Sequence, residues 1–322
     1  MKKGLLINDI ELAYAPMSAY HFNKLIKDKE FQDIFFDSHI YIIAQRKELT
    51  FNNFSFPKEF VLNFEISQKE NDKVIKCELP LTQENIATDL TQIIELRLHD
   101  RKNTPESKNG YPFNGTQGFS IKSKATLKSK SNLLAWFSPD KLFQNYWKGH
   151  INVDFSMDFS SFCEFKVQYV GKSTEQNICQ RLSSHSTFQE ILTNENSLSY
   201  GNIPSNEIMI LLFRIKDSNT IVKWGKESDA KEMSDYLNNY LLPSEKTISL
   251  DAEKALIKHL LPKYNKVLYK SFPNKTDLVN SDYHDTIFYA FSDPIKLVYE
   301  NGEIKGGKLY EQRDYIKVEN EK

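Results

Sequence analysis

Residues 167–173 read VQYVGKS, and the expected fold of the second half of the chain rests on this stretch. In a strand, Tyr169 and Gly171 would point to one face and Lys172 to the other. Gly171 would allow close approach of a backbone or a phosphate, although the upstream glycine of a Walker loop is missing. Tyr169 is either an ordinary aromatic at a strand end or a hydroxyl that orients or deprotonates a water.

Residues 177–192 predict a helix that carries Arg181 and His185 four positions apart, on one face. The planar guanidinium of an arginine suits phosphate oxygens, and a histidine one turn away can donate to the same phosphate or move a proton. Taken alone, the pair also fits an exposed helix surface.

A second predicted helix covers residues 251–261, with Asp251 as its N-cap and Pro262 after its end. Helical spacing puts Glu253 on the apolar face formed by Leu256, Ile257 and Leu260. A buried carboxylate needs a cation or a donor, and Mg²⁺ suits a site with one carboxylate, water and a substrate phosphate. The alternative is a first-turn glutamate that complements the helix dipole.

Taken in this order, the motifs resemble those of the GIY-YIG nuclease superfamily. Residues 169–171 match the YIG strand, Arg181 the family's arginine and His185 its partner. By the same resemblance, Glu253 is the metal ligand and Asn265 a structural residue that ties the last segment to the site. The resemblance covers roughly residues 150–275.

The fold class implied by the resemblance is α+β. An N-terminal mixed α/β domain, residues 1–148, is expected to select the substrate or a partner. A small GIY-YIG-like domain, residues 149–322, is expected to follow, with a short central sheet flanked by helices.

The GIY tripeptide itself is not found. The strand that should carry it is expected within residues 151–159, where the aromatic residues are Phe155 and Phe159. Phenylalanine can neither act as a base nor donate a hydrogen bond. Three alternatives follow: Tyr169 acts with His185, another residue such as Lys172 substitutes, or the domain binds nucleic acid without cutting it.

The composition, with 40% hydrophobic and 26% charged residues, is that of a folded protein. The net charge of −1 means that an anionic partner must meet a local patch. The segment between Ser107 and Pro139 has no acidic residue and is either a solvated face or a phosphate-contacting surface. Its lysines are Lys108, Lys122, Lys124, Lys128 and Lys130, of which the last four are the candidate nucleic-acid contacts.

Cellular location follows from what the sequence lacks. The three cysteines have no metal-ligand spacing, and no segment approaches the length of a membrane span. We therefore expect reduced thiols and a cytoplasmic protein without a membrane partner.

The expected function is a metal-dependent endonuclease that uses Mg²⁺ or Mn²⁺ and acts in restriction or phage defence. Its expected substrate is nucleic acid, with double-stranded DNA as the leading candidate. Its candidate catalytic residues are Tyr169, Lys172, Arg181, His185 and Glu253. A single site would nick, so cutting both strands would need a homodimer or sequential action. The alternatives are a decayed nuclease fold that serves as a nucleic-acid-binding or adaptor module, and an α/β protein with chance motifs.

Overall fold

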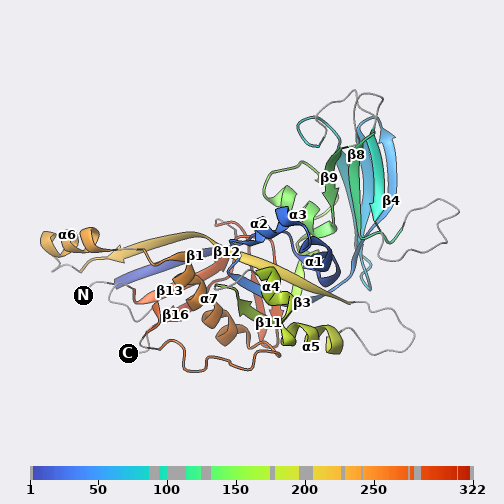
Figure 1. Ribbon diagram of the computed structural model, residues 1–322. Helices are drawn as coiled ribbons and strands as arrows, with labels where there is room; N and C mark the ends of the chain where they lie inside the picture. Colours follow the sequence, from blue (N-terminus) through green and yellow to red (C-terminus); the bar gives the residue numbers. More distant parts are fainter. Residues whose placement is uncertain are drawn as a thin grey trace. The chain divides into compact units, whose positions relative to one another are not determined.

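The chain forms two compact units in a computed structural model (Figure 1). Unit 1 comprises Met1–Arg46, Glu164–Asn202 and Ile208–Lys322, and unit 2 comprises Lys47–Cys163 with Ile203–Glu207. Residues 1–46, expected within an N-terminal domain 1–148, thus belong to the unit that carries the YVG strand. The structure describes residues 3–86, 94–99, 114–124, 132–174, 178–195, 206–225, 229–240, 242–274, 276–278, 284–309 and 311–319.

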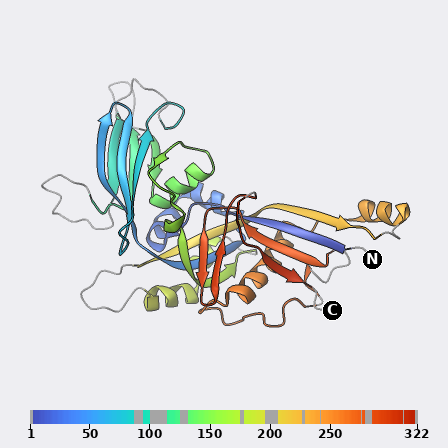
Figure 2. The ribbon, with the colours of Figure 1, turned by 180° about the vertical axis from the view of Figure 1, so that it is seen from behind.

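Unit 1 is built on a mixed sheet, here called sheet A, with strand order β15-β14-β11-β3-β12-β1-β13-β16 and β2 paired to β12. Figure 2 shows its C-terminal strands in orange and red. The strands are β1 (Lys3–Leu12), β2 (Met17–Ser18), β3 (Ile40–Lys47), β11 (Glu164–Lys172), β12 (Asn206–Lys223), β13 (Thr286–Phe291), β14 (Lys296–Tyr299), β15 (Gly302–Lys305) and β16 (Ile316–Glu319).

The predicted fold class is wrong, because the YVG strand β11 lies in this large sheet and not in a short one flanked by helices. Strands from both ends of the chain join it. β1 buries alternate residues such as Leu6 and Ile10, and it pairs with β12 and β13. Because these flanking segments carry strand patterns of their own, the sheet grows well beyond the motif-bearing part.

Beside the YVG motif, β11 pairs antiparallel with β3. The sequence pattern had suggested a partner strand within residues 151–159, and that expectation is wrong. Tyr41 of β3 lies opposite Gly171 in the register. Of the expected segment, only β10 (Asp154–Phe155) is a strand, and it pairs with β6 of unit 2. Its aromatics serve another purpose, since Phe155 and Phe159 pack against Phe143.

Short helices cover one face of sheet A and close the core of unit 1. They are α1 (Ala19–Leu25), α2 (Lys29–Phe35), α4 (Ile178–Ser183) and α5 (Ser186–Glu195). The core includes Tyr41 and Ile43 of β3, Leu182 of α4 and Phe188 of α5. A further helix, α6 (Ala230–Asn239), follows β12. Figure 1 shows α4 and α5 beside the strands of the motif region.

The helix predicted at residues 251–261 is longer at its start. Helix α7 (Glu245–Leu260) begins at Ser244, whose hydroxyl accepts a hydrogen bond from the Thr247 amide. Asp251 is therefore not the N-cap; it is buried and accepts a hydrogen bond of 2.7 Å from the Tyr289 hydroxyl. The predicted end before Pro262 is confirmed, and α7 packs against β11 and β16.

Unit 2 contains two antiparallel sheets. One, ordered β10-β6-β5-β4, has β4 (Leu49–Lys58), β5 (Val61–Gln68) and β6 (Val74–Pro80); the other has β7 (Ile94–His99), β8 (Gly118–Ser123) and β9 (Leu133–Phe137). Phe51, Phe64 and Phe119 form edge-to-face and tilted contacts that join the two sheets. Helix α3 (Pro139–Trp147) follows β9, and a short 3₁₀ turn covers Ser160–Phe162.

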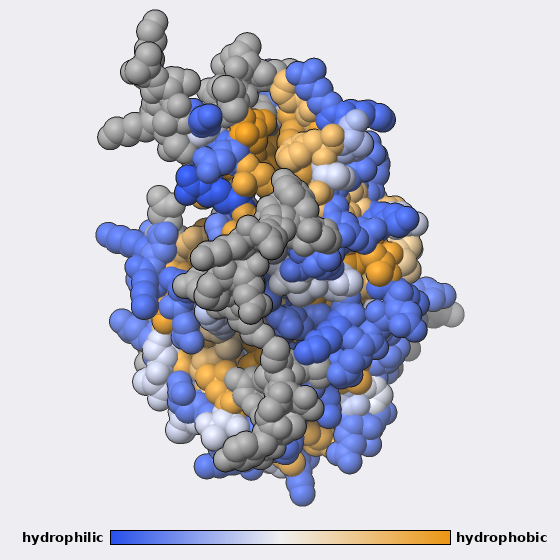
Figure 3. Space-filling model, turned by 90° about the vertical axis from the view of Figure 1, so that its right-hand side faces the viewer, coloured by the Kyte–Doolittle hydropathy of each residue, from blue (hydrophilic) through white to orange (hydrophobic). Residues whose placement is uncertain are grey.

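Hydrophilic residues predominate on the face drawn in Figure 3, with hydrophobic patches between them. Scattered apolar residues are normal on a folded surface. Among the described residues, no helix is long and apolar enough to span a membrane.

Candidate functional site

Two tyrosines from distant parts of the sequence lie side by side in unit 1. The rings of Tyr41 on β3 and Tyr169 on β11 have centroids 5.9 Å apart. A β-carbon added to Gly171 would lie 2.5 Å from Cζ and from the hydroxyl oxygen of Tyr41, and 2.7 Å from a ring atom of Tyr169. Gly171 is therefore required by the close approach of both phenol rings.

His185 completes an aromatic cluster with the two tyrosines. Its ring centroid is 5.2 Å from that of Tyr169 and 6.2 Å from that of Tyr41. The expected single helix is two helices, with His185 between them at the N-cap of α5. Arg181 therefore lies in α4 and His185 caps α5, although both face the tyrosines.

The hydrogen bonds of His185 assign its tautomer. Nδ1 accepts from the Phe188 amide at 3.2 Å, so in the neutral ring the proton is on Nε2. Nε2 lies 3.4 Å from the hydroxyl oxygen of Tyr169 and can donate to it. His185 thus directs the Tyr169 proton away from itself and caps α5 at the same time.

Burial fixes the protonation states of this cluster. It is the main cause of the raised pKa of Tyr41 and of Tyr169, whereas the Arg181 guanidinium lowers both. Burial, followed by Arg181, lowers the pKa of His185. At neutral pH the phenols are therefore protonated and the imidazole is uncharged.

Arg181, in the last turn of α4, is the electrostatic centre of the group. Its positive charge lowers the pKa values of both tyrosines, of His185 and of Glu253. The guanidinium is therefore within electrostatic range of all four side chains.

Glu253 forms the acidic part of the site. Its side chain is 8% exposed, and Oε2 lies 3.1 Å from Nζ of Lys172, which is 34% exposed. Burial is the largest effect on Glu253 and raises its pKa, while Lys172 and then Arg181 lower it. The prediction that Glu253 shares the apolar face of its helix is confirmed, since Leu256, Ile257 and Leu260 are buried with it.

Asn265 joins the segment after α7 to the YVG strand. Its Nδ2 donates to the Val170 carbonyl at 2.8 Å, and its Oδ1 accepts from the Val170 amide at 2.9 Å. The Tyr264 amide donates to the Gln168 carbonyl, two residues before Val170 in β11. The side-chain amide thus satisfies both backbone groups of Val170, as a neighbouring strand would.

The predicted nucleic-acid surface lies in unit 2, of which the structure describes Lys122 and Lys124. In the register of β7 and β8, Lys122 lies opposite Glu95. The hydrogen bond from Arg97 is the main cause of the lowered pKa of Glu95, and the charges of Lys122 and Lys124 lower it further, so both lysines lie near this carboxylate. Lys108, Lys128 and Lys130 are outside the described residues.

A metal at this site would have few protein ligands. Among the described residues there is no group of three or more histidine, cysteine, aspartate or glutamate side chains suited to a metal. Glu253 nevertheless fits a hard divalent ion, because its carboxylate is only 8% exposed and a buried carboxylate needs a compensating cation. Mg²⁺ commonly binds one or two carboxylates, water and substrate phosphate.

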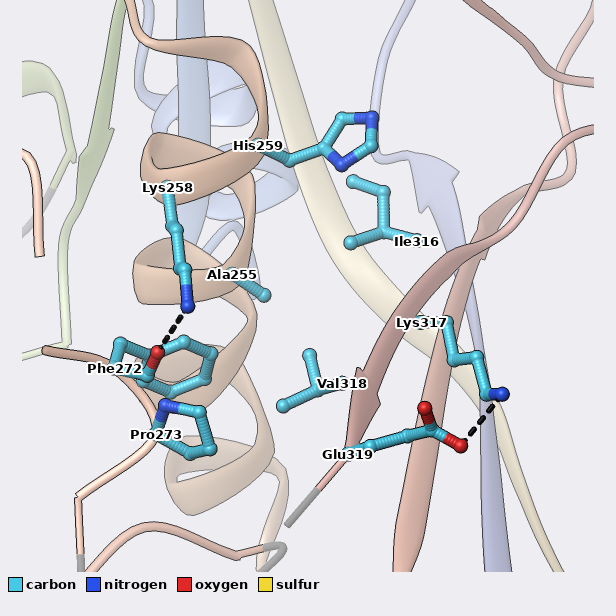
Figure 4. Close-up of a pocket in the computed structure, with 9 residues that line it drawn as sticks. All are labelled: Ala255, Lys258, His259, Phe272, Pro273, Ile316, Lys317, Val318 and Glu319. Atoms are coloured by element: carbon cyan, nitrogen blue, oxygen red, sulfur yellow. Dashed lines mark hydrogen bonds and ion pairs between the residues drawn. The ribbon is translucent and has the colours of Figure 1, made fainter. Parts of the chain in front are cut away.

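A cavity of about 360 Å³ lies beside α7 but is separate from this site (Figure 4). It is lined by Ala255, Lys258, His259, Phe272, Pro273, Ile316, Lys317, Val318 and Glu319. At about 100° per residue, Ala255, Lys258 and His259 project from the side of α7 opposite Glu253. None of the clustered side chains described above lines this cavity.

The residue missed by sequence reasoning is Tyr41. It follows His39 and Ile40 in an apolar stretch that is recognisable as a strand, but unit 2 separates that strand from the YVG fragment in the sequence. The available signal for a second site tyrosine was Tyr41 within this predicted strand. Its position opposite Gly171 follows only from the strand pairing.

Comparisons with protein-family models, with curated proteins and with solved structures find no match to this chain.

Proposed function

We propose that the protein is a metal-dependent endonuclease that hydrolyses phosphodiester bonds, with DNA as the expected substrate. One observation carries the proposal: Tyr41 and Tyr169, with His185 and Arg181, gather next to the paired Lys172 and Glu253. Neutral hydroxyls, fixed cations and one buried carboxylate are the groups that phosphodiester hydrolysis with a single metal requires.

Glu253 would hold Mg²⁺ or Mn²⁺. When bound, the ion would polarise the phosphoryl oxygen and stabilise the leaving oxygen. Glu253 is suited to this role because α7 fixes its backbone and burial keeps its carboxylate from bulk water.

Arg181 and Lys172 would bind the scissile phosphate. Both are cations in a group whose only described carboxylate is Glu253, so the local charge favours an anion. A planar guanidinium can contact two phosphate oxygens and neutralise charge that develops in the transition state.

The tyrosines would position the attacking water. Because burial raises their pKa values, they act as neutral hydroxyls and orient the water by hydrogen bonds. Since His185 Nε2–H can donate to the oxygen of Tyr169, the phenolic proton of Tyr169 is not taken up by His185 and can be donated to the Tyr41 hydroxyl, a water or a phosphate oxygen. Asn265 would hold β11, and with it Tyr169 and Lys172, in place.

The likeness to the GIY-YIG nucleases is proposed for this group of side chains and not for the fold. Tyr41 would take the part of the first-motif tyrosine, which was sought within residues 151–159. A decayed module was favoured by the absence of that tyrosine, so Tyr41 supports the catalytic alternative.

Unit 2 would contribute to substrate selection, with Lys122 and Lys124 among its contacts to the nucleic-acid backbone. It is inserted between β3 and β11, the two strands that carry the tyrosines. One site would cut one strand, so double-strand cleavage would need a homodimer or two successive events.

The test is nicking of supercoiled DNA by the purified protein with Mg²⁺ or Mn²⁺. We expect metal-dependent nicking that Glu253→Ala and Arg181→Ala both abolish. Variants that nick as fast as the wild type would overturn the site assignment. Salt-sensitive DNA binding without cleavage in any metal would favour the adaptor module instead.

A further inference from the structure

The ion pair of Lys172 and Glu253 joins two residues that the proposed function uses separately. Nζ and Oε2 are 3.1 Å apart, within reach of a direct contact. The carboxylate proposed to bind the metal and the ammonium proposed to bind the phosphate therefore form an ion pair with each other in the ligand-free protein.

The two partners differ in their freedom to move. Glu253 is buried in the apolar face of the 16-residue helix α7, with its side chain 8% exposed. Lys172 is the last residue of β11, and its side chain is 34% exposed. A lysine is a point charge on a flexible four-carbon stem, so Lys172 is the partner that can move away.

Lys254, the residue after Glu253, cannot take over this role without breaking another pair. Nζ of Lys254 lies 2.5 Å from Oδ1 of Asp277, whose side chain is only 2% exposed. Burial of Glu253 makes a cation necessary, and Lys172 is the cation in contact with it.

We propose that Lys172 is a resident counter-ion of Glu253 that a divalent cation displaces, and that the released ammonium then binds the substrate phosphate. This inference rests on the proposed function. In the metal-free protein Lys172 would offset the charge of the buried carboxylate, and metal binding would free its ammonium to contact the phosphate.

The consequence for metal affinity has a definite sign. A bound cation must compete with Lys172 for Glu253, so removing the ammonium should tighten metal binding. A competition of this kind corresponds to roughly a fivefold or larger change in affinity. A lysine that only supported the fold would give no such gain.

The test measures Mn²⁺ binding to the full chain by titration calorimetry at pH 8, without substrate. The variants are Lys172→Met and Glu253→Gln. The control is Lys296→Met, which removes another partly exposed lysine in unit 1 from its ion pair with Glu164 at 2.6 Å. We expect tighter binding in Lys172→Met, no binding at this site in Glu253→Gln, and wild-type affinity in the control.

A second measurement needs no variant and so does not depend on the folding of Lys172→Met. Acetylation of Lys172 in the wild type, followed by mass spectrometry, should accelerate when Mn²⁺ is added, while Lys296 is unaffected. Two results would overturn the proposed exchange of Lys172 for a metal ion at Glu253. One is unchanged labelling of Lys172, and the other is unchanged or weaker Mn²⁺ binding in a folded Lys172→Met protein.

The failure of the exchange differs from the failure of the proposed function. If Glu253→Gln loses Mn²⁺ and Lys172→Met gains nothing, Glu253 remains the metal ligand and only the exchange is wrong. If Glu253→Gln binds Mn²⁺ like the wild type, the metal assignment and the exchange both fall.

Discussion

Tyr41 and Gly171 lie directly opposite each other on antiparallel strands, so close that a β-carbon on Gly171 would come within 2.5 Å of the phenol ring. Strand β3 precedes unit 2 in the sequence and β11 follows it. The contact therefore depends on the sheet being assembled around an inserted unit, and it explains why a glycine ends the YVG motif.

Gly171→Ala should displace the Tyr41 ring and lower both stability and activity. The ring is fully buried, so the added methyl group overpacks the core, at a cost of about 1–3 kcal/mol. Urea denaturation and DNA nicking measure the two effects. In the matched variant Gly307→Ala the nearest atom would be 3.4 Å away, an ordinary contact, and both values should stay near wild type. Equal behaviour of the two variants would show that the close approach has no consequence.

Asn265→Asp should loosen the YVG strand. The carboxylate cannot donate to the Val170 carbonyl, which loses its bond of 2.8 Å, and the expected cost is about 1–3 kcal/mol. Urea denaturation and nicking give the readout. Asn85→Asp is the control, because Asn85 in unit 2 likewise donates to the carbonyl of one residue, Asn152, and accepts from its amide. Asn85→Asp should lose stability but retain the chemical step, whereas an Asn265→Asp protein with wild-type nicking would contradict the positioning role.

The protein should lose stability below about pH 6.5 through His185. The folded pKa of His185 is lowered from its ordinary value, chiefly by burial, so the unfolded chain takes up the proton first. The stabilising contribution is therefore present above the unfolded pKa and decreases as pH falls toward the folded one. Protonation of Nδ1 also removes the cap on Phe188.

Thermal unfolding between pH 7.5 and 5 measures this effect. His185→Asn keeps a capping oxygen but cannot titrate. Its melting temperature should fall less steeply with pH than that of the wild type, and an identical slope would exclude His185 as the cause.

Lys122→Ala with Lys124→Ala should weaken DNA binding in a salt-dependent way. If each lysine displaces about one counter-ion, the slope of log affinity against log salt should become shallower by about 2. Fluorescence anisotropy across a salt series gives this slope. The double variant Lys58→Ala with Lys73→Ala removes equal charge from unit 2 and should leave this slope unchanged. An equal change of slope in the two double variants would indicate a nonspecific effect of charge.

Periodicity predicted the acidic part of the site well. Glu253 shares its helix face with three apolar residues, and the helix ends before Pro262 as expected. The start was misjudged because Asp251 is an acceptable N-cap in sequence, yet Ser244 caps the helix earlier. The buried Tyr289, which binds the Asp251 carboxylate, belongs to a strand far along the chain.

The break between α4 and α5 had only a weak local signal. Ser183 and Ser184 donate from their hydroxyls to the carbonyls of Cys179 and Gln180, at 2.7 and 3.0 Å. Such bonds compete with the helical pattern, but two serines within an apolar periodicity do not predict a break by themselves. The break matters because it places His185 at a cap.

Tyr41 could not be assigned from the sequence, because register across an insertion is a tertiary property. Its strand was recognisable, but nothing local connects residue 41 to residue 171. The extent of sheet A was hidden for the same reason, since β1, β3 and β13 are brought together by long-range pairing.

The most direct test of the account is the single-turnover rate of DNA nicking by Tyr41→Phe with saturating Mn²⁺. The change removes one buried hydroxyl and leaves the ring over Gly171, so the fold should be retained. We expect the rate to fall by about 10²-fold or more, while Tyr146→Phe, on the aromatic cluster of α3 in unit 2, cuts like the wild type. A folded Tyr41→Phe protein that nicks DNA at the wild-type rate would contradict the claim that Tyr41 completes the site.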